Sequence, residues 1–342
     1  MDGRPQHRIA LVTTAATALA ALATVVAVVA VPTFGLIRST VSTTASAATA
    51  EQLATQTVHP SATTAATAEE VPYPVATLTT TIVDPTRSTP ARGSTPASSS
   101  RALTVTISYP TTESATQFPL LVFVHGYDVS AATYEDLEQE IAEEGFVVAA
   151  PDFPLSSSAL DGVAERDIVE QASDVSFVIT SLLDESSRPA ALATLIADTK
   201  VGVIGHSDGA VTAAGVGFND ADADPRIGAV VMLSGAEAFF PGAWFGGSSS
   251  DSPALLAIHG TADEINPFAA SQELFDDATG PTWLVAVSGG SHFEPFTTDP
   301  VRTRVAALAA RFFRAELQGD LDAFASIDDA ASAPGLAPIA AK

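Results

Sequence analysis

Short apolar runs alternate with helical patterns along most of the chain. Runs with almost no polar residue have the length of strands buried on both faces, at 119–124, 146–150, 201–204, 227–233, 254–258 and 283–287. Between these runs, apolar residues recur at helical spacing in stripes that begin at Tyr134, Ile168 and Val301. Alternating strands and helices are typical of a mostly parallel sheet that helices cover on both faces. The pattern therefore predicts an α/β fold.

A different pattern precedes the first buried run. Residues 75–83 are rich in strand-forming residues, and 103–109 alternate between apolar and polar positions. The segment between them, 84–100, is rich in Pro and Ser. We predict that the two segments pair as an antiparallel N-terminal hairpin across this loop. Because the insertion at 236–247 is short, we expect a minimal lid.

The beginning of the chain indicates targeting rather than folding. Residues 9–37 hold no charged residue, and Arg4 and Arg8 precede them. Residues 1–38 are therefore either an export signal or a single membrane anchor. Small residues at 45–50 offer cleavage sites, and the sequence leaves the two alternatives open. In either case the positive-inside rule places the rest of the chain outside the cytoplasm, secreted or anchored to the membrane.

The remaining boundaries follow from composition. Residues 39–70 are rich in Ala, Thr and Ser and predict a flexible linker. We assign 71–318 to one catalytic domain, and 319–342, rich in Ala, Pro and Asp, to a loose C-terminal tail.

Overall composition excludes some partners and some chemistry. The chain has 342 residues, 46% of them hydrophobic, which suffices for one large core. The net charge of −25 makes nucleic acid and anionic membrane surfaces poor partners. The absence of cysteine excludes disulfides and a thiol nucleophile. Oligomeric state stays open.

Ser207 is the strongest candidate for a nucleophile. It lies in Gly-His-Ser-Asp-Gly at 205–209, directly after the apolar run 201–204 and before a stretch of small residues. A sharp strand-to-helix turn of this kind can expose a serine hydroxyl above a sheet, and the flanking glycines remove Cβ clashes. The alternative is an ordinary helix N-cap.

A base and an acid follow downstream in the chain. Asp263 comes just after the run 254–258, and His292 follows the run 283–287 in a Gly/Ser loop. Because parallel strands end at one edge of a sheet, Ser207, Asp263 and His292 can meet there as a triad. Glu264 is the rival acid. The other histidines of the domain, His125, His206 and His259, flank glycine turns, and we expect neutral, packed rings.

The sequence offers three further features. The backbone N–H groups of Tyr127 and Asp208 are the expected oxyanion hole. Aromatic residues offer an acyl pocket, although the loop that carries most of them could instead only pin itself to the core; they are Phe239, Phe240, Trp244 and Phe293. The acidic stretch 219–224 reads as a solvated turn rather than a calcium loop, because the central glycine and terminal glutamate of such a loop are absent.

Taken together, these motifs resemble the α/β-hydrolase family over about residues 71–318. The matching parts are the elbow at 205–209, His-Gly-Tyr at 125–127, His-Gly-Thr-Ala-Asp at 259–263 and Gly-Gly-Ser-His at 289–292. Residues 84–87 and 150–154 look like the branch that holds platelet-activating-factor acetylhydrolase-like proteins, dienelactone-hydrolase-like proteins and bacterial polyesterases. The resemblance implies a serine esterase that needs no cofactor.

The sequence thus predicts an exported serine hydrolase that cleaves carboxylic esters through an acyl-enzyme. Its substrate would be a small-molecule or polymeric ester. An acyltransferase or a peptidase could use the same triad. A non-catalytic surface protein on the same fold is a weaker alternative, because a binding module does not need all three groups.

Overall fold

The computed structural model describes residues 71–236, 242–245 and 252–342. The chain divides into two units, 1–65 and 66–342, and the first lies outside the described residues together with the predicted targeting segment and linker. Within the described ranges, no helix is both long and apolar enough to cross a membrane.

A nine-stranded sheet forms the centre of the second unit, in the order β1-β2-β4-β3-β5-β6-β7-β8-β9. Strands β3 to β8 run parallel, as the apolar runs predict. β1 and β2 form the expected antiparallel hairpin, which joins the sheet through β4. The strands are β1 Val75–Asp84, β2 Arg101–Pro110, β3 Leu120–Val124, β4 Val147–Asp152, β5 Val201–His206, β6 Ile227–Leu233, β7 Ala254–Gly260, β8 Thr282–Val287 and β9 Leu336–Ala341.

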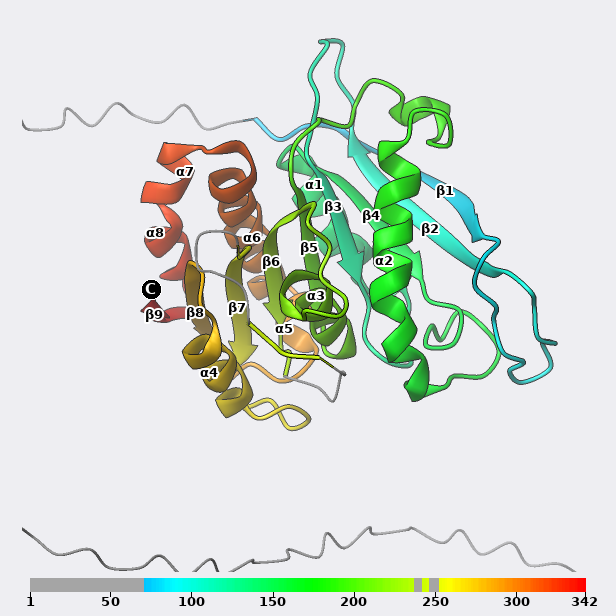
Figure 1. The fold of residues 1–342 in the computed structure, drawn as a ribbon. Coiled ribbons are helices and arrows are strands. Elements are labelled where there is room, and N and C mark those ends of the chain that lie inside the picture. Colours follow the sequence, from blue (N-terminus) through cyan, green and yellow to red (C-terminus); the bar gives the residue numbers. More distant parts are fainter. Residues whose placement is uncertain (1–70, 237–241, 246–251) are drawn as a thin grey trace, which may run out of the picture. The chain divides into compact units, whose positions relative to one another are not determined.

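Helices cover both faces of this sheet (Figure 1). α1 and α6 pack on one face, where Leu137, Ile141 and Phe312 join the same apolar cluster. α2 and α3 pack on the other face through residues such as Val175 and Val216. The α-helices are α1 Glu135–Glu143, α2 Ile168–Leu183, α3 Asp208–Phe218, α4 Phe268–Asp277, α5 Glu294–Thr297, α6 Val301–Gln318, α7 Leu321–Ala325 and α8 Ile327–Ala331. Short 3-10 helices are η1 Ala131–Tyr134, η2 Glu165–Asp167 and η3 Ala190–Leu192.

The C-terminal segment 319–342 is not the loose tail that its composition suggested. Gly319 ends α6 in the left-handed conformation, with φ 67°. The carboxylate of Asp320 then caps α7 by accepting hydrogen bonds from the N–H groups of Asp322 and Ala323. Ile327 is buried against the apolar cluster beneath α6, and β9 pairs antiparallel with β8 at the edge of the sheet. Local capping and a few buried side chains thus order a polar segment.

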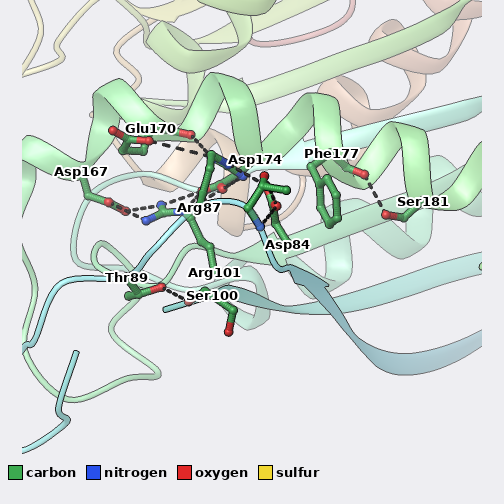
Figure 2. Close-up of polar contacts among 11 residues, drawn as sticks. Asp84, Arg87, Thr89, Ser100, Arg101, Asp167, Glu170, Asp174, Phe177 and Ser181 are labelled. Carbon is green, nitrogen blue, oxygen red and sulfur yellow. Dashed lines mark hydrogen bonds and ion pairs between the residues drawn. The ribbon is translucent and has the colours of Figure 1, made fainter. Parts of the chain in front are cut away.

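A buried ion-pair cluster ties the N-terminal hairpin to α2 (Figure 2). Arg101, the first residue of β2, is 1% exposed and donates hydrogen bonds to both carboxylate oxygens of Asp167 and of Asp174. Arg87 bridges Asp174 to Asp84 at the end of β1. Burial of these charges is costly, so each depends on its partners for compensation.

We predict that Arg101→Leu destabilises the protein by about 3–5 kcal/mol, because it leaves two carboxylates buried without their main cation. Urea unfolding measures the change in free energy. Arg302→Leu is the matched control. Arg302 pairs with Asp136 and Asp299, whose side chains are 70% and 58% exposed, and with Glu140, which is 21% exposed. Because all three carboxylates keep contact with water, its loss should cost about 1 kcal/mol or less. Equal losses for the two variants would contradict the role of burial.

Candidate active site

The direction of the strand order changes between β3 and β5. β4 lies on one side of β3 and β5 on the other, so the connections after β3 and β5 run to opposite sides of the sheet. In parallel sheets such a switch point, at the carboxyl ends of the strands, is where ligands bind. Val124 and Gly205 pair in register at these ends, directly before His125–Tyr127 and Ser207. The fold therefore brings the two predicted loops together.

Ser207 occupies the sharp turn between β5 and α3. Its backbone has φ 56° and ψ −124°, a conformation that costs free energy for any residue with a side chain. The turn closes because two neighbours are glycine. A Cβ on Gly205 would lie 2.1 Å from the Gly209 carbonyl oxygen, and a Cβ on Gly209 would lie 2.0 Å from that of Val124. A side chain at Gly205 would push the start of α3 away from β5, and a side chain at Gly209 would push it away from the end of β3.

The structure places Ser207, His292 and Asp263 in one hydrogen-bonded chain. Nε2 of His292 is 2.9 Å from Oγ of Ser207, and its Nδ1 is 2.8 Å from Oδ2 of Asp263. The side chains of His292 and Asp263 are buried, whereas Ser207 is partly exposed. Because a carboxylate can only accept, Nδ1 carries the proton and Nε2 faces the serine as an acceptor. This arrangement can remove a proton from the serine hydroxyl.

Asp263, and not Glu264, contacts the imidazole. Burial alone would raise the pKa of Asp263, but hydrogen bonds from His292 and from the backbone N–H groups of Ile265 and Asn266 lower it below its ordinary value. The carboxylate is therefore charged near neutral pH. Glu264 is exposed to solvent.

Two further histidines form hydrogen bonds to the loops that surround the triad. His125 donates from Nδ1 to the carbonyl oxygen of Gly126 at 2.7 Å and accepts at Nε2 from the N–H of Phe153 at 3.1 Å. His259 donates from Nε2 to the carbonyl oxygen of Asn266 at 3.0 Å and accepts at Nδ1 from the Ser271 hydroxyl at 2.7 Å. Burial lowers the pKa of both rings. They are neutral and buried as expected, but no sequence pattern indicated that they bind the loops of the site.

The predicted oxyanion donors lie in segments that flank the serine. A Cβ on Gly126 would be 3.2 Å from both Cβ of Ser207 and the His206 carbonyl oxygen, so the backbone before Tyr127 runs against the nucleophile. The Gly126 carbonyl and the Tyr127 N–H belong to one trans peptide and point in opposite directions. His125 therefore sets the direction of the Tyr127 N–H by holding that carbonyl. Asp208 is the first residue of α3, where N–H groups favour negative charge.

The aromatic residues proposed for an acyl pocket have different positions. Phe239 and Phe240 lie outside the described residues. Phe293 is half-buried beside the triad, with its ring 5.1 Å from that of His292. Trp244 pairs with Asn219, just past the end of α3 that is farthest from Ser207, and packs against the core. The core-pinning alternative describes this position of Trp244, since α3 spans about 15 Å between Ser207 and Asn219.

The acidic stretch 219–224 is used for internal contacts. Asp224 binds the guanidinium of Arg226, and Asp220 accepts a hydrogen bond from the N–H of Ala243. Nowhere in the described part of the chain do three or more His, Cys, Asp or Glu side chains gather as metal ligands would.

Two comparisons with known proteins find similar proteins. The family model described as Chlorophyllase matches residues 77–237. Among solved structures, a ferulic acid esterase from Streptomyces cinnamoneus is similar with a TM-score of 0.61 and 20% sequence identity, over 80% of this chain and 98% of that chain. No curated protein sequence matches the chain. The expected α/β-hydrolase fold is thereby confirmed, and both matches support a carboxylic ester hydrolase of the serine esterase type.

Proposed function

We propose that this chain is an exported esterase that works through an acyl-enzyme on Ser207. One observation carries the proposal. At the switch point of the sheet, a partly exposed serine in a strained turn is hydrogen-bonded to a buried imidazole, which is hydrogen-bonded to a buried carboxylate. Nucleophile, base and orienting acid in this order are what acyl transfer requires.

In the proposed mechanism, Oγ of Ser207 attacks the acyl carbon while Nε2 of His292 takes its proton. Asp263 holds the imidazole in one tautomer and stabilises the imidazolium that forms. The N–H groups of Tyr127 and Asp208 stabilise the oxyanion. His292 then gives its proton to the leaving alcohol, and water releases the acid by the reverse sequence of steps. Besides the attacking water, each step uses only groups of this chain and the substrate.

The similarity to a ferulic acid esterase supports a carboxylic ester as substrate. The charge of Asp263 is consistent with ester cleavage, because a negative carboxylate next to His292 can stabilise the imidazolium that forms there.

Export is proposed from the sequence of the first residues. The uncharged run 9–37 after Arg4 and Arg8 supports a signal or an anchor, and the Ala/Thr/Ser-rich segment 39–70 supports a linker to the catalytic unit.

Replacement of the nucleophile tests the proposal directly. Ser207→Ala should lower kcat for an aryl ester by about a millionfold, leaving only the contribution of binding and the oxyanion hole. A fluorophosphonate should label the wild-type protein once, at Ser207, and should not label the variant. Labelling of another serine in the wild-type protein would contradict the assignment.

Two neighbouring acids allow a matched comparison. Asp263→Asn should lower kcat by about ten-thousandfold with the fold intact, because an amide no longer fixes the tautomer of His292. Glu264→Gln, one residue along the same loop, should change kcat less than twofold because that side chain is exposed. Steady-state kinetics together with circular dichroism separate the two. If Glu264→Gln were the damaging change, Asp263 would lose its role.

Export is checked by fractionation of a bacterial host that expresses the full chain. We expect the protein in the membrane fraction or outside the cytoplasm, because the first 38 residues resemble a targeting segment. Amino-terminal sequencing distinguishes a cleaved signal, with a new end near Ala48 or Glu51, from an anchor that keeps Met1. Intact full-length chain recovered from the soluble cytoplasmic fraction would overturn the export proposal.

A further inference from the structure

Tyr134, a buried tyrosine at the end of η1, lies beneath the triad and has no part in the mechanism described above. Its side chain is 1% exposed, and its hydroxyl is 2.7 Å from Nδ1 of His206. Nε2 of His206 is in turn 2.8 Å from the carbonyl oxygen of His292. We propose that Tyr134 is a positioning residue that acts through His206 to hold the base His292 in place.

The bond between His206 and the carbonyl oxygen of His292 determines which atom donates in each of these hydrogen bonds. A carbonyl oxygen can only accept, so Nε2 of His206 carries the proton that it shares with His292. In the neutral ring Nδ1 must then accept, and the only proton available to it is that of the Tyr134 hydroxyl. The phenol therefore selects the one tautomer of His206 that can bind the backbone of the base.

Electrostatics give a reason for keeping His206 neutral. Its ring lies against that of His292, with centroids 4.7 Å apart. Burial, and next the charge of His292, lower the pKa of His206 to about 3. A second positive charge at this distance would oppose the imidazolium that forms on His292 during catalysis. Burial also raises the pKa of Tyr134, so the phenol keeps its proton as a donor.

The hydroxyl of Tyr134 also lies next to the segment 125–127, which carries the Tyr127 N–H of the predicted oxyanion hole. The backbone N–H of Gly126 lies close enough to lower the pKa of Tyr134 against the effect of burial. A Cβ on Gly126 would be 3.6 Å from Nδ1 of His206, which places the loop and the imidazole side by side. One hydroxyl therefore borders both the segment before Tyr127 and the histidine that holds the base, two parts of the site that the neighbouring strands β3 and β5 supply.

Tyr134→Phe tests this role, because it removes the hydroxyl and keeps the ring that packs 4.9 Å from Phe123. We expect kcat for an aryl ester to fall about tenfold while KM changes less than twofold, since loss of alignment acts on the transition state rather than on substrate binding. The melting temperature should fall by only a few degrees. Tyr73→Phe is the matched control. Tyr73 packs on Phe118, far from the triad in the fold, and its loss of a hydroxyl should leave kcat unchanged.

A double-mutant cycle shows whether Tyr134 works through His206. His206→Phe keeps an aromatic ring among His292, Phe293 and Phe296 and removes both nitrogens. If the two residues act as one chain, the double variant should lose no more activity than His206→Phe alone. Losses that multiply would overturn the inference, as would a Tyr134→Phe enzyme with wild-type kcat or a tenfold higher KM at unchanged kcat.

This inference rests on the proposed function, and the two can fail separately. If Ser207→Ala abolishes ester hydrolysis while Tyr134→Phe keeps wild-type kcat, only the role of Tyr134 is wrong. If wild-type protein shows no hydrolysis that depends on Ser207, the proposed function fails and this inference with it.

Discussion

The active site depends on one close contact between backbones. The turn at Ser207 has a positive φ, which costs a residue with a side chain about 1–3 kcal/mol, and the surrounding structure must supply that free energy. It does so where β5 and α3 meet the end of β3, with no room for a side chain at Gly205 or Gly209. The contact that strains the serine backbone therefore also places the nucleophile beside the segment that leads to Tyr127.

Three neutral histidines order the loops that lack regular hydrogen bonding around this turn. Each lies within one residue of the end of a strand, and each donates one ring N–H to a backbone carbonyl: His125 to Gly126, His206 to His292 and His259 to Asn266. Each ring accepts at its other nitrogen, from Phe153, Tyr134 and Ser271 respectively. A buried neutral imidazole has one donor and one acceptor, so it can be fully satisfied inside the protein while it joins two segments.

The sequence predicted the parts of the fold whose signals are local and strong. The fully buried strands are continuous apolar runs, and Ser207, Asp263 and His292 follow such runs. The prediction from sequence failed where a tertiary contact, and not a local pattern, determines the structure. β9 buries mainly Leu336 and gains its order from pairing with β8, and α7 begins at the cap formed by Asp320. The aromatic residue Trp244 could line a pocket or pack on the core, and only its pairing with Asn219 distinguishes the two.

Buried charge is arranged differently at the two ends of the domain. Near the hairpin, the guanidinium of Arg101 compensates Asp167 and Asp174. At the site, Nε2 of His259 lies 3.3 Å from Oδ2 of Asp263, close enough to neutralise it if the ring were charged. Burial keeps that ring neutral, so His259 supplies no positive charge to the carboxylate of Asp263 before the reaction. In the proposed mechanism its charge is then available to the imidazolium of His292, at the step in which Ser207 loses its proton.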